Sequence, residues 1–165
     1  TFNDYFAKIG KKLALSKEIA NIGVLHPMRS AYFDYKFEKD QRGLSNINKT
    51  FDEDNRLFEE LHLDYHYLDE TILASHANVK NNTLCVGKCT YKYIILPRSV
   101  ITMDKTTESL LSEFVKNGGK VLLMGDKPEY LEGDKFDYPY LVSNTSFEEI
   151  LTKGTDDIKS ISVSE

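Results

Sequence analysis

Three short apolar runs constrain the fold of this chain more than any other feature of its sequence. The runs are Ile22-Gly-Val-Leu25, Tyr93-Ile-Ile-Leu96 and Val121-Leu-Leu-Met124, and a proline or glycine follows each of them within two residues. Runs of this length that end at turn residues are typical of strands buried on both faces of a parallel sheet. Helical patterns separate them, so we expect right-handed βαβ crossovers with helices on both faces of the sheet.

Two weaker segments complete the predicted sheet. Tyr65-His-Tyr-Leu68 is aromatic and β-prone, and Tyr140-Leu-Val142 is expected to be the last strand. Asn81-Asn82, between Val79 and Leu84, predicts a small hairpin at the periphery. The predicted fold class is therefore α/β: a flavodoxin-like three-layer sandwich with a mainly parallel five-stranded sheet and a small peripheral hairpin.

Caps, apolar spacing and terminal glycines predict the helices. Thr50-x-x-Glu53 and Ser146-x-x-Glu149 are capping boxes, in which two side chains satisfy the first amides of a helix. The predicted helices lie within residues 1–20 with Asn3 or Asp4 as cap, from Thr50 to near His62, over residues 71–77 with Asp69 or Thr71 as cap, before Gly118-Gly119, and after Ser146.

The stretch from Met28 to Lys49 shows no clean helical or strand period. Its aromatic side chains alternate with charged ones; they are Tyr32, Phe33, Tyr35 and Phe37. A segment this long without secondary structure of its own is typical of a functional or docking loop. We therefore predict a loop here that contacts another domain or another molecule.

Length and charge limit the classes of partner. The 165 residues fit one domain, because domains most often contain roughly 100 to 150 residues. The net charge of −5 lacks the basic field that nucleic-acid binding requires, so we expect no nucleic acid as a partner. The apolar runs are far shorter than the roughly 20 residues that span a bilayer, so we expect no membrane partner either.

The two ends of the sequence predict a fragment of a longer protein. The chain starts at Thr1 without Met or a signal peptide, and Ile161-Ser-Val-Ser-Glu165 resembles the start of a further strand. We expect a leading helix in residues 1–20, an α/β core over 22–155 and the start of the next segment at 156–165. Localisation stays open: bacterial and periplasmic or extracellular for an exported parent, and otherwise cytoplasmic.

The residues after the predicted strands do not resemble a cofactor site. Open parallel sheets bind ligands beyond the carboxyl ends of their strands, where this chain has His26-Pro-Met-Arg-Ser30 instead of a glycine-rich phosphate cradle. Leu96-Pro-Arg98 likewise lacks the aspartate that a phosphate-receiving signalling domain needs. The motifs GxGxxG, GxxxxGK[ST], GxSxG and HExxH do not occur in the sequence. We predict no cofactor.

Two clusters of reactive side chains are assigned structural roles. His62-x-Asp64-x-His66 would face a metal from one side of an extended segment, but the pattern fits better with His62 ending a helix, Asp64 in a turn and His66 in a strand. Asp69 and Glu70 are adjacent, and adjacent side chains in extended backbone point to opposite faces. We therefore predict neither a metal site nor an acid/base pair here.

The two cysteines are predicted to be mostly free thiols. In one continuous strand Cys85 and Cys89 would lie about 13 Å apart, which is too far for a disulfide. A turn at Gly87-Lys88 would place Val86 opposite Cys89 and Cys85 opposite Thr90, so the two thiols would be only diagonal neighbours. Neither arrangement predicts a bridge.

Three stretches resemble one domain of large glycoside hydrolases. They run from Phe2-Asn-Asp-Tyr to Ile22-Gly-Val-Leu-His-Pro27, from Asp64 to Glu70, and from Val86 to Pro97. The resemblance is to α-L-rhamnosidase-type multidomain enzymes, where such a domain follows a catalytic barrel and precedes β-sandwich modules. That domain is similar in fold to class I glutamine amidotransferases and to the trimerisation domain of β-galactosidases. The resemblance covers nearly the whole chain.

The same resemblance implies that this chain lacks the amidotransferase nucleophile. In that family the strand after a glycine-ended helix leads into a turn that carries a cysteine. The matching stretch here is Asn117-Gly-Gly-Lys-Val-Leu-Leu-Met-Gly125-Asp-Lys-Pro128, which contains no cysteine. Cys85 and Cys89 precede an earlier strand, so neither can replace it. We predict no catalytic residue.

Three hypotheses of function follow. The first is a non-catalytic accessory domain of a glycoside hydrolase acting on plant or microbial polysaccharide, which packs against the catalytic barrel or an oligomer partner through the aromatic residues 32–37. The second is a carbohydrate-binding module that uses aromatic and arginine side chains at the strand ends. The third is a free-standing enzyme, for which Ser30 near His26 is the nearest approach to a nucleophile and base.

The accessory-domain hypothesis is favoured. Together with the carbohydrate-binding hypothesis it predicts one set of residues that contact a ligand or a partner. The predicted contact residues are His26, Arg29, Tyr32, Tyr35, Asp69, Glu70 and Arg98. The predicted partners are the other domains of the parent glycosidase, with carbohydrate or a second copy of the chain as further candidates. The structure can show which of these side chains lie together.

Overall fold

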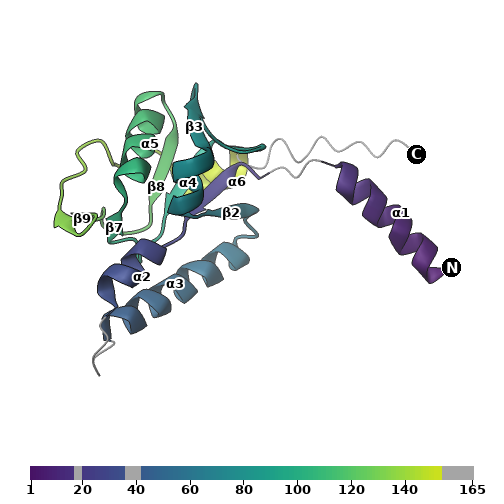
Figure 1. The fold of residues 1–165 in the computed structure, drawn as a ribbon, viewed down its shortest axis with the longest axis horizontal. Coiled ribbons are helices and arrows are strands. Elements are labelled where there is room, and N and C mark those ends of the chain that lie inside the picture. Colours follow the sequence, from purple (N-terminus) through teal and green to yellow (C-terminus); the bar gives the residue numbers. More distant parts are fainter. Residues whose placement is uncertain (17–19, 36–41, 154–165) are drawn as a thin grey trace.

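The computed structural model describes residues 1–16, 20–35 and 42–153, so the expected segment 156–165 and Phe37 lie outside the described residues. The helices are α1 (Phe2–Leu15), α2 (Met28–Asp34), α3 (Arg42–Glu60), α4 (Glu70–His76), α5 (Lys105–Lys116) and α6 (Phe147–Lys153), as Figure 1 shows. The strands are β1 (Ile22–Leu25), β2 (Tyr65–Leu68), β3 (Ala77–Lys80), β4 (Thr83–Val86), β5 (Cys89–Tyr91), β6 (Tyr93–Leu96), β7 (Thr102–Met103), β8 (Lys120–Leu123), β9 (Tyr130–Leu131) and β10 (Asp134–Lys135).

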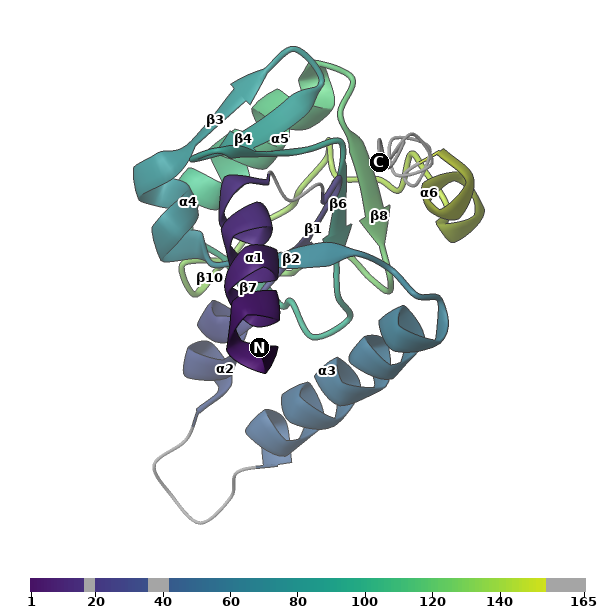
Figure 2. The ribbon, with the colours of Figure 1, turned by 90° about the vertical axis from the view of Figure 1, so that its right-hand side faces the viewer.

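The central sheet contains four parallel strands in the order β2-β1-β6-β8. Every residue of β1 and β6 is buried, as the apolar runs predicted. Helix α5 packs on one face through Leu111 and Phe114, and α3 and α6 pack on the other through Phe58 and Ile150. Figure 2 shows α5 and α6 on opposite sides of β8. The predicted α/β class with a mainly parallel sheet is confirmed.

The predicted fifth strand at Tyr140-Leu-Val142 was wrong, because the described residues include no strand there. The segment still lies along the outer edge of β8. Asn144 accepts from the Val121 N–H through its side-chain oxygen at 2.7 Å and donates its own N–H to the Val121 carbonyl at 3.0 Å. The Ser143 hydroxyl accepts from the Leu123 N–H at 2.8 Å. Side chains thus supply the bonds that a fifth strand would have made.

The predicted hairpin is confirmed, and it belongs to a three-stranded antiparallel sheet in the order β3-β4-β5. Its turn contains Asn81 at a φ of 53°, a left-handed conformation that asparagine tolerates. The second turn pairs Val86 with Cys89, and both cysteines of the chain are free thiols, as predicted. A further small sheet has the order β10-β9-β7.

The prediction of a long loop from Met28 to Lys49 was wrong for residues 28–34 and 42–49, while residues 36–41 lie outside the described part of the chain. Residues 28–34 form α2, and α3 begins at Arg42, eight positions before the predicted start at Thr50. Residues 28–34 and 45–49 bury little, with Ser30 the buried residue of α2 and Ile47 the buried residue among 45–49. An apolar period therefore does not develop in the sequence, although the backbone is helical.

The ends of two helices show why particular residues are present. At the end of α5 the Gly119 N–H donates to the Phe114 carbonyl and the Gly118 N–H to the Val115 carbonyl, which is a Schellman motif. Gly118 has a φ of 83°, and a Cβ on Gly119 would lie 2.4 Å from the Phe114 ring. The cap of α1 is Thr1, not Asn3 or Asp4 as predicted, although Asp4 completes its capping box.

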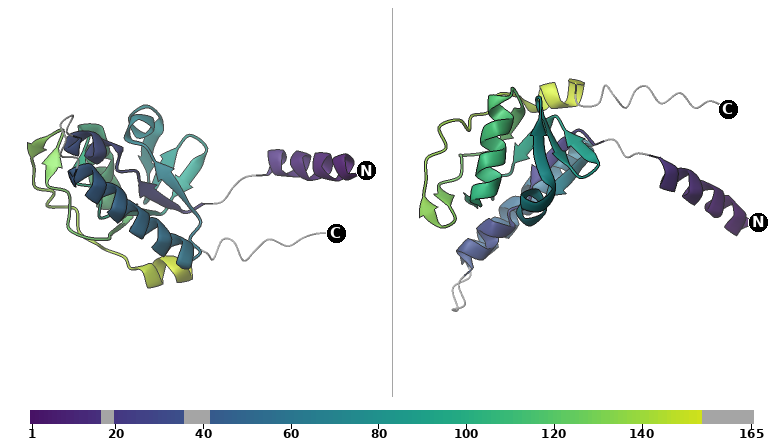
Figure 3. Two further views of the ribbon diagram at one scale, coloured as in Figure 1. Left: turned by 90° about the horizontal axis from the view of Figure 1, so that it is seen from below. Right: turned by 45° about the horizontal axis from the view of Figure 1, so that its top comes forward.

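Helix α1 stands apart from the rest of the molecule in Figures 1 and 3. It has no buried residue. None of the helices in the described ranges combines the length and apolar character needed to cross a bilayer.

Candidate functional site

The carboxyl ends of the four central strands meet at one edge of the sheet. His26 follows β1, Asp69 follows β2, Arg98 lies two residues after β6 and Gly125 lies two residues after β8. Strands β2 and β6 lie on either side of β1, so the chain reverses its direction of progress across the sheet at the ends of β1 and β6. Ligands of open α/β sheets bind at such a point. This edge is therefore the candidate site.

Arg98 is held in place by an acid of α3. Its backbone N–H donates to Asp54 Oδ2 at 3.0 Å, its Nε–H donates to Asp54 Oδ1 at 2.7 Å, and Nη2 lies 2.6 Å from the same oxygen. Asp54 is fully buried, whereas the more exposed Glu53 approaches the guanidinium at 3.3 Å. The bond to Asp54 keeps the pKa of Arg98 above its ordinary value. The guanidinium thus serves to join α3 to the end of β6.

The sequence analysis did not predict a role for Asp54, although the spacing of this residue from its apolar neighbours indicates one. It lies seven residues after Ile47 and four before Phe58, and both of these apolar residues are buried. Spacings of four and seven place three residues on the same helix face. An acid within an apolar face needs a partner in the folded protein, and Arg98 is that partner.

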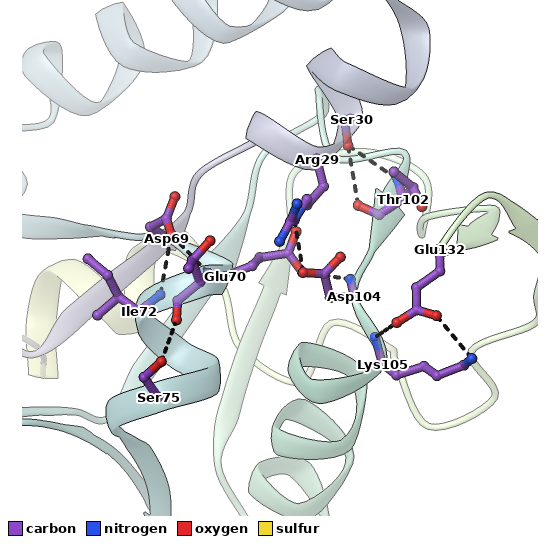
Figure 4. Close-up of polar contacts among 11 residues, drawn as sticks. Arg29, Ser30, Asp69, Glu70, Ile72, Ser75, Thr102, Asp104, Lys105 and Glu132 are labelled. Carbon is purple, nitrogen blue, oxygen red and sulfur yellow. Dashed lines mark hydrogen bonds and ion pairs between the residues drawn. The ribbon is translucent and has the colours of Figure 1, made fainter.

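Arg29, Glu70 and Asp104 form a second polar cluster, shown in Figure 4. The Arg29 Nε lies 2.8 Å from Asp104 Oδ2, and the Asp104 backbone N–H donates to Glu70 Oε2 at 2.7 Å. Glu70 is buried, and this burial raises the pKa of its carboxyl above the ordinary value, although the Asp104 amide opposes the shift. The cluster joins the first turns of α2, α4 and α5.

Asp69 and Glu70 point away from each other, as predicted. Asp69 caps α4, where its Oδ1 accepts from the backbone N–H groups of Thr71 at 2.8 Å and Ile72 at 3.3 Å. Glu70 is directed to the opposite side, toward Asp104 (Figure 4). The two carboxyl groups therefore have separate partners.

His26 lies in a cluster of rings, apart from both arginines. Its ring centroid is 5.3 Å from those of Phe51 and Tyr67, in edge-to-face arrangements. Burial lowers the pKa of His26 below its ordinary value, and the charge of Asp69 opposes this shift. The ring packing gives His26 an apolar contact role at the end of β1.

Ser30 is buried in α2 and binds the backbone beside β7. Its Oγ accepts from the Ile101 N–H at 2.9 Å and from the Thr102 N–H at 3.2 Å, and Figure 4 shows the contact with Thr102. Its hydroxyl also lies 3.3 Å from the Thr102 carbonyl, to which it donates. Ser30 thus anchors α2, and these contacts do not present it to His26.

Tyr32 and Tyr35 lie on the surface of α2 and at its end. Tyr32 is 65% exposed, Phe33 43% and Tyr35 49%. The Phe33 ring lies 4.9 Å from that of Tyr130, and a Cβ on Gly133 would lie 3.5 Å from it, so it rests against the β9-β10 turn. These three exposed rings form what we call the α2 aromatic surface.

The described residues include no group of three or more His, Cys, Asp or Glu side chains placed to hold a metal ion. His62 follows the end of α3 at a φ of 51°, and His66 Nδ1 lies 3.0 Å from the Tyr91 hydroxyl. Asp64 precedes β2 and is exposed. The positions of His62 at a helix end and of His66 in a strand agree with the prediction.

A groove of about 440 Å³ lies beside β2, outside the predicted contact set except for Asp69. Strand β2 forms one wall, and residues of α4, β4 and β5 form the other. Its lining residues are Tyr65, His66, Tyr67, Leu68, Asp69, Ile72, Leu73, Val86 and Tyr91. No pattern in the sequence predicts this groove, because its walls come from separate segments of the chain.

Comparison of the chain with protein-family models, curated proteins and solved structures gave no match.

Proposed function

We propose that this chain is a non-catalytic accessory domain of a glycoside hydrolase acting on plant or microbial polysaccharide. In this proposal it packs against the catalytic barrel, or against an oligomer partner, through the α2 aromatic surface. The observation that carries the proposal is the exposure of Tyr32, Phe33 and Tyr35 on one short helix and its end. Clustered exposed apolar side chains mark interaction sites, and aromatic residues are enriched in them.

The surface is supported from beneath in a way that suits docking. Ser30 anchors α2 to the backbone of residues 101–102, and the Arg29–Asp104 ion pair joins it to α5. Phe33 rests on Tyr130. Side chains that are already held in place lose less conformational entropy when a partner binds them.

Three observations support a non-catalytic role. Arg29 and Arg98 are engaged in ion pairs, Asp69 and Glu70 diverge, and the turn at Gly125 carries no cysteine. The packing of α5 and of α3 with α6 on opposite faces supports a flavodoxin-like three-layer arrangement, which is part of the proposal together with its likeness to glutamine amidotransferase domains.

The carbohydrate-binding alternative has weaker support. It requires Arg29, Arg98 and His26 to be available to a sugar, but the arginines are bound to Asp104 and Asp54, and His26 packs against two rings. Tyr32 and Tyr35 remain exposed for stacking. Calorimetric titration with rhamnose-containing and galactose-containing oligosaccharides tests it, and saturable heat that disappears with Tyr32→Ser would favour it.

The accessory role is tested by expressing this chain and the neighbouring module encoded in frame with it as two polypeptides. We expect the neighbouring module to be a glycosidase barrel that binds the chain, with binding weakened at least about tenfold by Tyr32→Ser combined with Tyr35→Ser. Ile72→Ser, at an exposed position outside the α2 aromatic surface, is the matched control and should leave binding unchanged. Absence of binding, or equal loss in both variants, would refute the proposal.

A further inference from the structure

The two edge strands of the central sheet differ in how their outer backbone groups are hydrogen-bonded. The outer edge of β8 is hydrogen-bonded by Ser143 and Asn144. Strand β2 is the other end strand, and within the described residues its strand partner is β1 alone. Its sequence Tyr65-His-Tyr-Leu68 contains no lysine, proline or bulge of the kind that protects exposed edges. This edge therefore requires some other cover.

The groove beside β2 is suited to an apolar partner. Ile72 is 52% exposed and Tyr67 40% exposed, so these two side chains supply apolar surface at its rim, while the buried Leu68 and Leu73 line its floor. Its volume of about 440 Å³ is large enough to accept several side chains. A helix that places an apolar face in such a groove is a common mode of recognition.

Within the described ranges 1–16, 20–35 and 42–153, helix α1 has an apolar face that is not covered. Phe2 is 77% exposed, Tyr5 61%, Phe6 53% and Leu13 66%. These positions share one face, because each residue advances about 100° around a helix. An isolated helix of 14 residues is marginal in water, so a partner for this face would stabilise it.

The two borders of the apolar face of α1 differ in charge. Lys8 and Lys12 lie one turn apart beside Tyr5, along one border. The other border carries the small side chains of Ala7 and Ala14. The helix therefore presents a basic side and a neutral side to whatever covers its apolar face.

The groove has the complementary pattern. Asp64 precedes β2 and Asp69 follows it, so acids lie at both ends of that wall. Lys88 and Lys92 flank β5 on the other side. A helix with its lysines toward β2 and its alanines toward β5 gains attraction on one side and avoids like charges on the other.

We propose that α1 of one copy of this chain occupies the β2 groove of a second copy, in a reciprocal dimer. In Figures 1 and 3, α1 points away from its own body, so it is placed to reach a neighbour. Direct antiparallel pairing of two β2 strands in full register would instead bring Asp64 of one copy opposite Asp69 of the other. Like charges directly opposite each other are destabilising. The dimer goes beyond the proposed accessory function and does not depend on it.

The expected interface is large enough to be stable. Each aromatic side chain of α1 can bury about 150–250 Å², and each helix carries Phe2, Tyr5 and Phe6. Two exchanged helices and the two grooves that receive them reach on the order of the 1,200–2,000 Å² typical of specific complexes. The exchange is isologous, so it closes at two copies.

Sedimentation equilibrium of the 165-residue chain tests the dimer. We expect the mass to rise with concentration from 18.9 kDa to twice that value. Phe6→Ser in α1 and Ile72→Glu in the groove should each weaken the dimer at least about tenfold, since both remove an apolar contact. Tyr32→Ser, in the α2 aromatic surface, is the control and should leave the dimer constant unchanged. Circular dichroism confirms that each variant is folded.

A charge exchange tests the orientation of the helix. Lys8→Glu combined with Lys12→Glu should weaken the dimer at low salt, and Asp64→Lys added to the same chain should restore it, because the attraction is then reversed in sign. A chain that is monomeric at all concentrations would overturn the proposal, as would a dimer unaffected by Phe6→Ser and Ile72→Glu. A dimer lost only with Tyr32→Ser would overturn it and support packing through the α2 aromatic surface.

Discussion

Replacement of Asp54 by alanine is predicted to be strongly destabilising. Asp54 is fully buried in α3, and it accepts from the Arg98 backbone N–H and guanidinium at distances between 2.6 and 3.0 Å. Alanine removes the carboxylate and leaves these donors without their acceptor. The same arginine also approaches Glu53, which is 45% exposed, at 3.3 Å. Glu53→Ala is therefore a matched control, because it removes the second acid that contacts the same arginine.

The magnitude follows from the burial of the two acids. Breaking a buried ion pair by removing one partner costs about 3–5 kcal/mol, and a hydrogen bond to a charged group contributes about 1.5–3 kcal/mol. The Arg98 side chain is 42% exposed, so water replaces part of the lost contacts. We expect Asp54→Ala to lower the free energy of unfolding by about 2–4 kcal/mol, and Glu53→Ala by about 0–1 kcal/mol.

Urea unfolding at pH 7, followed by circular dichroism, measures both losses. The midpoint of Asp54→Ala should fall well below that of the wild type at an unchanged slope, and that of Glu53→Ala should stay close to it. Equal small losses in the two variants would show that Asp54 does not join α3 to the end of β6, and the reasoning would be refuted.

Three further predictions concern other parts of the fold. Burial raises the pKa of Glu70, so the folded protein binds the proton of this carboxyl more tightly than the unfolded chain does. The contribution of Glu70 to the free energy of unfolding therefore falls as the pH rises from the ordinary pKa to the raised one. Glu70→Gln should therefore gain stability relative to the wild type across that pH window in urea titrations, and a growing wild-type advantage would contradict this. Gly119→Ala should cost about 1–3 kcal/mol in thermal unfolding, because its Cβ would lie 2.4 Å from the Phe114 ring; an unchanged melting temperature would show that the ring can move aside. Asn144→Ala should cost about 1–2 kcal/mol and speed hydrogen exchange at the Val121 amide, whereas unchanged exchange would show that the edge of β8 is protected otherwise.

The elements that were predicted correctly have local causes. The strands at 22–25 and 93–96 are buried on every residue, so their apolar runs are complete in the sequence. Asp69 caps α4 and Gly118 ends α5 through bonds to neighbouring residues. Such short-range chemistry can be recognised in a single sequence.

The features that were missed depend on distant residues or on exposed surface. Among residues 45–49 of α3 only Ile47 is buried, so this part of the sequence carries no apolar period before Thr50. Segment 140–142 has β-prone residues, but Ser143 and Asn144 bind β8 through side chains instead of a strand ladder. Three residues of the predicted contact set, His26, Asp69 and Arg98, follow strand ends at one edge of the sheet. His26, Arg29 and Arg98 nevertheless have separate partners, which lie far from them in the sequence.

The central claim is that the α2 aromatic surface is covered by another domain or subunit in the complete protein. Hydroxyl-radical footprinting tests it by comparing residues 1–165 alone with the longest polypeptide encoded in frame with them. The account predicts that oxidation of Tyr32, Phe33 and Tyr35 falls several-fold in the longer polypeptide, while other exposed side chains of this domain react as before. Equal oxidation of the three rings in both proteins would contradict it.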